Sequence, residues 1–232
     1  MDKMTTALAA PKHVGVLGTG QYASAFARRL LTAGYSVTLG SRYPHQRSSQ
    51  QHPKDAGDSE SALGDVRVTS LEDCVTGNNV IVVALHADHF RSVFTEDLAR
   101  LCAGKTLVDV SNRSGGRGSG SDGTESNAHL LQSFVPDAAV VKAFNSVSAY
   151  VMENDVTAGG PRVVEVASNN VKARAAVCAL ARDLGFDPCE KGGLRNAWQM
   201  EESVLTVLPE WKVAAWATLL LLIFWLLFAV GR

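Results

Sequence analysis

A glycine-rich turn near the N-terminus has the residue types that bind a nucleotide pyrophosphate. The pattern GxGxxA occupies six consecutive positions: Gly18, Thr19, Gly20, Gln21, Tyr22 and Ala23. Gly18 permits a tight turn, Gly20 lets the backbone approach a pyrophosphate, and Ala23 is small enough for a helix to pack on a strand. The N-terminus of that helix would face the anion. Because the turn follows an apolar run and opens a helical segment, it predicts a dinucleotide site; a glycine turn without a ligand is the plainer alternative.

The end of the second predicted strand indicates which dinucleotide is bound. An NAD enzyme places Asp or Glu about 20 residues after the glycines, where it binds the ribose 2′-hydroxyl. Here that position reads Gly40-Ser41-Arg42 and has no carboxylate. A hydroxyl and a guanidinium suit a 2′-phosphate, which arginine can bind through two parallel hydrogen bonds. Ser41 and Arg42 therefore predict NADPH in preference to NADH, unless Arg42 is only a solvated surface charge.

An alternation of strands and helices must hold these residues in place. Apolar runs predict strands at residues 13–18, 35–39, 66–69, 80–85, 106–110, 139–142 and 163–167. Helical spacing lies between them, at residues 22–33, 71–75, 89–101, 126–134 and 171–184. This α/β pattern predicts a Rossmann-like doubly wound parallel sheet, whose ligands bind at the carboxyl ends of the strands.

Two polar stretches interrupt this pattern. Residues 47–64 have no apolar period and predict a surface excursion. Residues 113–123 are rich in glycine and serine and predict a flexible loop at the carboxyl edge of the sheet. Such a loop is either a tolerated insertion or a mobile lid over the ligand.

The bulk composition restricts the class of protein. A chain of 232 residues can bury one sizeable core. Its net charge of −1 gives no reason to expect a nucleic-acid partner. The four cysteines form no CxxC pair and do not lie at metal-ligand spacing from a histidine, so no metal site is expected. They predict reduced, mostly buried thiols: Cys74, Cys102, Cys178 and Cys189.

The C-terminal segment differs in kind from the rest of the chain. Residues 213–230 are 18 positions without a charge, and roughly 20 apolar residues span a bilayer core. Trp211 and Lys212 supply an interfacial anchor, although a buried core helix is the alternative. The first 12 residues lack the apolar core of a signal peptide. We therefore expect a flexible arm at 1–12, a cytosolic NADP-binding domain at 13–208, and a single transmembrane helix at 211–230.

Several motifs, taken in order, resemble a known family. They are Val14–Gly20, Gly40-Ser41-Arg42, Val108–Asn112, Glu125–Ala128, Val141–Asn145, Ala197-Trp198 and Leu208–Val213. The set resembles the N-terminal oxidoreductase domain of the STEAP metalloreductases (six-transmembrane epithelial antigen of the prostate). That domain is in turn similar to microbial deazaflavin-dependent NADP oxidoreductases. The resemblance extends from about Val14 to Lys212, and its last motif matches the segment that leads into the family's first membrane helix.

The resemblance implies an electron path and a set of binding residues. In such proteins NADPH reduces a flavin (FAD), which reduces a haem in the membrane domain, which reduces ferric or cupric ions outside. It implies that Gly18, Thr19, Gly20 and Gln21 hold the pyrophosphate, and that Ser41 and Arg42 hold the 2′-phosphate. The nicotinamide end would be lined by Ser111, Asn112, Ala143, Phe144 and Asn145, although Phe144 could instead be a core residue. No catalytic side chain is assigned, because in hydride transfer the cofactor supplies the reactivity.

The family also implies a location and partners. An endosomal or plasma membrane is implied, as are homo-oligomers or hetero-oligomers with full-length relatives. The chain departs from the family pattern because none of its six histidines lies in the C-terminal apolar segment, so it is not expected to ligate haem. Two functions remain open: an NADPH-dependent, metalloreductase-like oxidoreductase, or a membrane-tethered, catalytically incomplete nucleotide-binding subunit that acts through full-length relatives.

Overall fold

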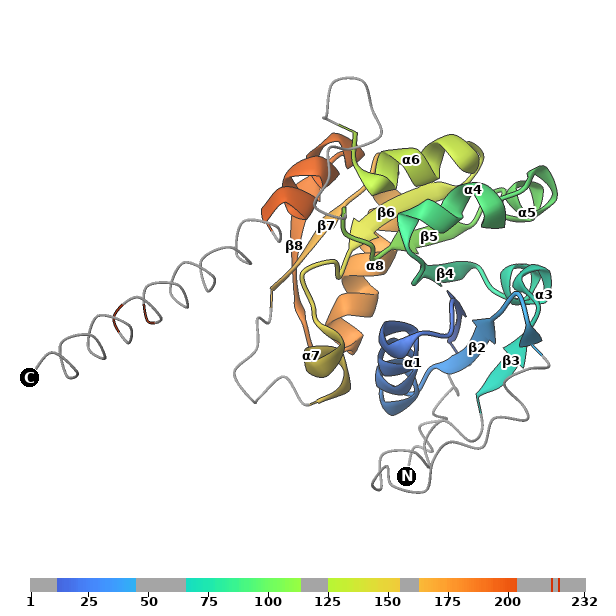
Figure 1. Ribbon diagram of the computed structural model, residues 1–232, viewed down its shortest axis with the longest axis horizontal. Coiled ribbons are helices and arrows are strands. Elements are labelled where there is room, and N and C mark those ends of the chain that lie inside the picture. Colours follow the sequence, from blue (N-terminus) through green and yellow to red (C-terminus); the bar gives the residue numbers. More distant parts are fainter. Residues whose placement is uncertain are drawn as a thin grey trace, which may run out of the picture.

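A computed structural model describes residues 12–44, 66–113, 125–154 and 163–203, together with Thr218 and Leu221. In this part of the chain, helices cover both faces of an eight-stranded sheet with the order β3-β2-β1-β4-β5-β6-β7-β8 (Figure 1). The strands are β1 (His13–Leu17), β2 (Ser36–Gly40), β3 (Arg67–Thr69), β4 (Val80–Val83), β5 (Thr106–Asp109), β6 (Ala139–Ala143), β7 (Val163–Ala167) and β8 (Asp187–Gly192). The predicted Rossmann-like α/β fold is confirmed.

One strand pair departs from the predicted parallel arrangement. The five strand pairs from β3 to β6 along the sheet are all parallel, but β7 runs antiparallel to β6, with Lys142 opposite Ala167. After β6 the chain forms α7 (Ala149–Glu153), which packs against α1 (Gln21–Thr32) instead of crossing back along the sheet. The chain therefore enters β7 from the carboxyl edge of β6.

The remaining helices lie at predicted positions, except for the last two, which were not predicted. They are α3 (Leu71–Thr76), η2 (Ala87–His89), α4 (Phe90–Val93), α5 (Glu96–Leu101), α6 (Asn127–Phe134), α8 (Val171–Asp183), η4 (Leu194–Asn196) and a helical segment at 197–203. The helix predicted at 89–101 is broken because Thr95 starts a new helix, its hydroxyl accepting a hydrogen bond from the Leu98 N–H. Strand β8 was not predicted, because its sequence Asp-Pro-Cys-Glu-Lys-Gly has no apolar run.

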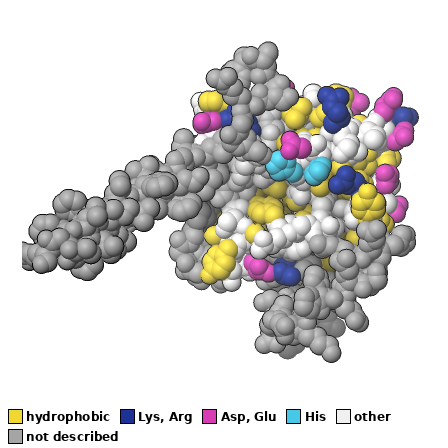
Figure 2. Space-filling view, viewed as in Figure 1, with side chains coloured by type: hydrophobic (Ala, Val, Ile, Leu, Met, Phe, Trp, Pro, Cys, Tyr) yellow, Lys and Arg dark blue, Asp and Glu magenta, His cyan; other side chains and the backbone are white. Residues whose placement is uncertain are grey.

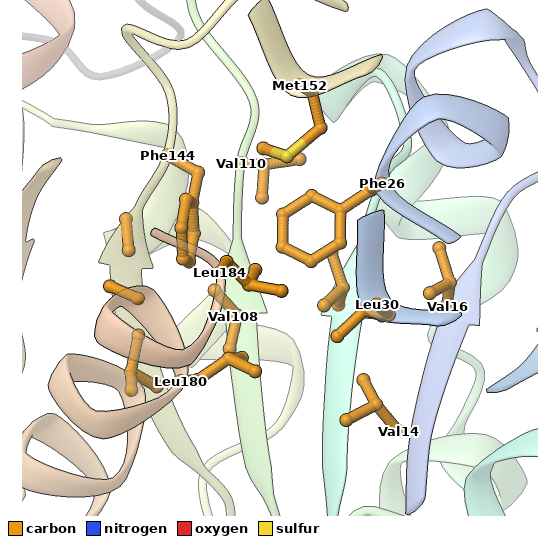
Figure 3. Packing of buried hydrophobic residues seen from close by; sticks show 14 of the residues in the cluster. Val14, Val16, Phe26, Leu30, Val108, Val110, Phe144, Met152, Leu180 and Leu184 are labelled. Atoms are coloured by element: carbon orange, nitrogen blue, oxygen red, sulfur yellow. The ribbon is translucent and has the colours of Figure 1, made fainter. Parts of the chain in front are cut away.

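Two hydrophobic cores lie on opposite faces of the sheet. Because side chains alternate along a strand, Val82 of β4 joins one core while Ile81 and Val83 join the other. Helices α1, α7 and α8 cover the first core, and α3 to α6 cover the second. In the first core, Phe26 of α1 packs among residues of β5 and α7 (Figure 3).

The cysteines are free thiols, and three of the four are buried, as predicted. Burial raises the pKa of Cys74 to about 12 and that of Cys102 to about 11, while Cys189 on β8 is partly exposed. Because thiolate is the nucleophile, we expect Ellman's reagent at mildly alkaline pH to modify Cys189 at least about tenfold faster than the other three thiols. Peptide mass spectrometry over time measures this order. Modification of Cys74 or Cys102 at the rate of Cys189 would contradict it.

Some predicted segments fall outside the described residues. Among those that the structure describes, no helix is long and apolar enough to cross a membrane. The transmembrane helix predicted at 211–230 lies outside them, except for Thr218 and Leu221. The arm at 1–12 and the loop at 113–123 also lie outside, except for Lys12 and Arg113, as does the whole of 47–64.

Candidate functional site

The turn between β1 and α1 places its two glycines in very different surroundings. Gly18 has a φ of +115°, and a Cβ atom there would lie 2.5 Å from the Ala84 carbonyl oxygen. Its N–H donates to the Gly40 carbonyl at 3.0 Å, which holds the turn beside the end of β2. Gly20 has a φ of −73°, and a Cβ atom there would meet nothing within 4 Å. Gly18 is thus required by the fold, whereas Gly20 borders open space.

The N-terminus of α1 differs from the N-termini of five other helices. Gly20 is its N-cap residue, no side chain caps its first N–H groups, and its first turn holds no acidic residue. The termini of α3, α5, α6, α7 and α8 are all capped by a side chain: Ser70, Thr95, Ser126, Ser148 and Asn170. An uncapped terminus leaves N–H donors and a partial positive charge directed outward, which suits a phosphate group. Thr19 and the exposed Gln21 flank this terminus, and Ala23 is buried against the sheet.

The predicted 2′-phosphate residues lie beside this turn. The Ser41 N–H donates to the Thr69 carbonyl at 2.9 Å, and the Ser41 hydroxyl oxygen accepts from the Tyr43 N–H at 3.1 Å. Arg42 is exposed. Within the described ranges Arg42 forms no ion pair, so its guanidinium is available to an anion at the carboxyl end of β2.

The asparagines predicted at the nicotinamide end bind to each other. Asn112 Nδ2 donates to the Asn145 carbonyl at 2.6 Å, and Asn145 Nδ2 donates to Asn112 Oδ1 at 3.0 Å. Asn145 Nδ2 also donates to the Met200 carbonyl at 3.0 Å. These contacts join the loop after β5, the loop after β6 and the helical segment 197–203 at one edge of the sheet.

Phe144 contributes its backbone to this edge and its ring to the core. The ring packs edge-on against Phe26 at 5.1 Å and against Phe186 at 6.0 Å between centroids, as Figure 3 shows for Phe26. Its φ of +60° is unusual for a residue other than glycine. The Tyr22 hydroxyl donates to the Phe144 carbonyl at 2.9 Å, and burial raises the pKa of Tyr22, so the phenol stays a donor. Tyr22 thereby ties the glycine turn to the end of β6, beside the buried Ala143.

A cluster of buried charges behind this edge was not predicted from the sequence. Lys142 Nζ lies 2.9 Å from Asp109 Oδ2 and 2.7 Å from Glu201 Oε1, and all three side chains are fully buried. Arg113 Nε lies 3.6 Å from Glu201 Oε2, and the Arg113 guanidinium also pairs with Glu202 and stacks over the Trp198 ring. We call Asp109, Lys142 and Glu201 the charge cluster.

The electrostatics of the charge cluster follow from its burial. Burial raises the pKa of the Glu201 carboxyl above its ordinary value, and the charge of Lys142 and the hydrogen bonds from Lys142 and Asn127 oppose that rise. A sequence signal existed for two members, because Asp109 and Lys142 are charges within otherwise apolar strands. No sequence signal indicated Glu201 or Arg113. Arg113 was expected to start a flexible loop, yet its side chain is only 10% exposed.

Two exposed histidines follow β4 at the same carboxyl edge. His86 Nδ1 lies 3.0 Å from Asp88 Oδ2, and the His86 and His89 rings are 6.5 Å apart. On the face shown in Figure 2, histidine side chains lie next to one another, and acidic and basic side chains are interspersed around them. In the described ranges, no group of three or more His, Cys, Asp or Glu residues could hold a metal ion.

Comparisons with known proteins agree with this geometry. The family model for coenzyme F420-dependent NADP oxidoreductases matches residues 13–113. Metalloreductase STEAP2 of Homo sapiens is 37% identical over 223 residues, which cover 94% of this chain and 41% of that protein. Metalloreductase STEAP3 of Rattus norvegicus is 37% identical over 204 residues, which cover 88% of this chain and 38% of that protein.

The chain carries an oxidoreductase domain of the STEAP family. It spans about two fifths of the length of these curated relatives. A crystal structure of a candidate F420-dependent NADP reductase from Arthrobacter sp. FB24 shares the fold of this STEAP-type domain. That structure has a TM-score of 0.69 and 29% identity, and the match covers 89% of this chain and 94% of the other. The STEAP-type domain is thus an NADP-oxidoreductase fold, as its glycine turn and strand order indicate.

Proposed function

We propose that this domain oxidises NADPH and passes the electrons through a flavin towards ferric and cupric ions. The uncapped N-terminus of α1 carries the proposal, because it opens onto unoccupied volume at Gly20 and lies beside Ser41 and Arg42. The metalloreductase relatives support the acceptor side of the proposal. The plain alternative, a glycine turn that binds nothing, does not account for an uncapped terminus at α1 when α3, α5, α6, α7 and α8 are all capped by a side chain.

The residues present fit NADPH along the carboxyl edge of the sheet. Gly18, Thr19, Gly20 and Gln21 would hold the pyrophosphate on α1, and the guanidinium of Arg42 would hold the 2′-phosphate together with Ser41. Ser111, Asn112 and Asn145 would meet the carboxamide and ribose of the nicotinamide, next to the backbone of Ala143 and Phe144. NADPH supplies the hydride when bound, and the protein supplies position and electrostatics. FAD enters the proposal through the family resemblance alone.

The membrane part of the proposal rests on the sequence. Residues 211–230 would cross a bilayer after a domain at 13–208, because residues 213–230 carry no charge. Lys212 would then mark the cytosolic end, at an endosomal or plasma membrane. Haem would be ligated outside this chain's own histidines, in an oligomer with full-length relatives.

The experiment that tests the function follows the absorbance of NADPH. We expect the purified chain to oxidise NADPH slowly when FAD and a ferric chelate are added, and to bind NADPH without them. A chain that binds no NADPH in a calorimetric titration would refute the proposed function. NADPH binding without any oxidation would instead favour the nucleotide-binding subunit.

The cofactor preference gives a second measurable result. NADPH should bind more tightly than NADH, and Arg42→Ala should reduce that preference by about 1–3 kcal/mol, because a charge-assisted pair with the 2′-phosphate is lost. Titration of both nucleotides with both proteins measures the difference. Arg100→Ala is the matched control, since Arg100 pairs with Asp97 on α5 away from the glycine turn. Equal affinities for the two nucleotides in the unmutated chain would contradict the assignment of Arg42.

A further inference from the structure

Ser111, at the proposed nicotinamide end, is held on three sides. Its N–H donates to Asp109 Oδ1 at 3.0 Å, and its carbonyl accepts a hydrogen bond from Lys142 Nζ. Its hydroxyl oxygen accepts from Asn127 Nδ2 at 3.0 Å. Because the hydroxyl already accepts this bond, its own hydrogen is the group left to donate to a ligand. Ser111 thus has a fixed backbone and a fixed position of its hydroxyl oxygen.

The third member of the charge cluster fixes the group that holds that hydroxyl. The Asn127 N–H donates to Glu201 Oε1 at 3.1 Å and to Oε2 at 3.2 Å. Glu201 in turn accepts from Lys142, so the cluster closes a loop from β5 through β6 and α6 to the helical segment 197–203. Met200 in the same segment accepts from Asn145. The segment therefore reaches both sides of the proposed nicotinamide end.

Stability alone is a poor explanation for three fully buried charges. Removing charges from water is costly, and apolar replacements of a whole buried ion cluster are often neutral or stabilising. The hydrogen bonds of the charge cluster are instead directed to Ser111 at the edge of the sheet and to Asn127, which binds the Ser111 hydroxyl. An arrangement that fixes one polar side chain is what accurate placement of a ligand requires, since a misplacement of about 1 Å can reduce a rate about 100-fold.

We propose that Asp109, Lys142 and Glu201 are positioning residues that fix Ser111 and Asn145 for the nicotinamide half of the dinucleotide. This inference rests on the proposed function, because it needs NADPH at the carboxyl edge. Within the described part of the chain, the charge cluster forms its hydrogen bonds and ion pairs away from the glycine turn and the end of β2, so the adenine half should be independent of it. That separation provides the test.

The test uses a variant in which the charge cluster is neutral but retains its shape: Asp109→Asn, Lys142→Met and Glu201→Gln together. Calorimetry measures the affinities for NADPH and for 2′,5′-ADP, which carries only the adenine half with its 2′-phosphate. We expect the affinity for 2′,5′-ADP to stay within about twofold and that for NADPH to fall about tenfold or more. The kcat for NADPH oxidation with FAD should also fall. The control variant, Glu165→Gln with Lys191→Met, neutralises the ion pair between β7 and β8 and should change none of these values.

Each other outcome has a defined meaning. If the neutral variant is folded by circular dichroism and both affinities are unchanged, or both fall together, the positioning role is wrong. If the unmutated chain binds neither ligand, the proposed function fails, and the inference fails with it. If the neutral variant does not fold, Asn127→Ala removes the contact to the Ser111 hydroxyl with the charges intact. It should then weaken NADPH binding severalfold while 2′,5′-ADP binding is kept, and equal effects on both ligands would overturn the proposal.

Discussion

Replacing Lys142 alone with methionine is expected to lower the free energy of unfolding by about 3–5 kcal/mol. Lys142 lies between the carboxylates of Asp109 and Glu201, and all three side chains are fully buried. Without the ammonium group, two carboxylates face each other in the interior, and among the described residues only Arg113, at 3.6 Å from Glu201, remains as a cation beside them. Urea unfolding followed by circular dichroism measures the loss.

A surface ion pair provides the matched control for this prediction. Lys191 on the edge strand β8 pairs with Glu165 on β7 at 2.7 Å, and the Lys191 side chain is 40% exposed. Lys191→Met should change stability by less than about 1 kcal/mol, because exposed pairs contribute little. The neutral triple variant should regain most of the stability that Lys142→Met loses, since no charge is left unpaired. A loss below about 1 kcal/mol for Lys142→Met would show that the cluster does not depend on its cation.

Replacing Gly20 with valine is expected to weaken NADPH binding strongly while the fold is kept. The Gly20 backbone is extended, with a φ of −73°, and a Cβ atom there would meet nothing within 4 Å. Stability should therefore fall by less than about 1 kcal/mol. The side chain would occupy the volume over the N-terminus of α1 and block at least two charge-assisted hydrogen bonds of about 1.5–3 kcal/mol each. The affinity for NADPH should then fall at least about 100-fold.

Gly18→Ala should instead lower the stability of the fold, and it serves as the comparison variant. Gly18 has a φ of +115°, and a Cβ atom would lie 2.5 Å from a backbone oxygen that cannot move aside. We expect a loss of at least about 2 kcal/mol in the free energy of unfolding, from backbone strain and overpacking. Thermal unfolding and NADPH titration of both variants separate the two roles. If Gly20→Val binds NADPH normally, the pyrophosphate does not lie at this turn.

The order of elements could be predicted because it depends on local patterns. Alternating or continuous apolar runs report which residues face a core, and Val14, Val16 and Ile81 behave as those runs predict. The glycine turn is also a local signal, since the positive φ of Gly18 and its close backbone neighbour require glycine there. The broken helix at Thr95 was missed because a capping hydroxyl within an apolar period is a weak signal beside the period itself.

The sequence by itself determined the α/β class, the glycine turn before α1, and the replacement of the ribose-binding carboxylate by Ser41 and Arg42. Only the tertiary structure decided the antiparallel direction of β7, the pairing of polar β8, and the position of the Phe144 ring. It alone brought Glu201 to Lys142 and Asp109. The physical reason is that burial of an apolar face follows from spacing along the chain. The partner of a buried charge is set by strand register and by the packing of a distant helix, which no local pattern records.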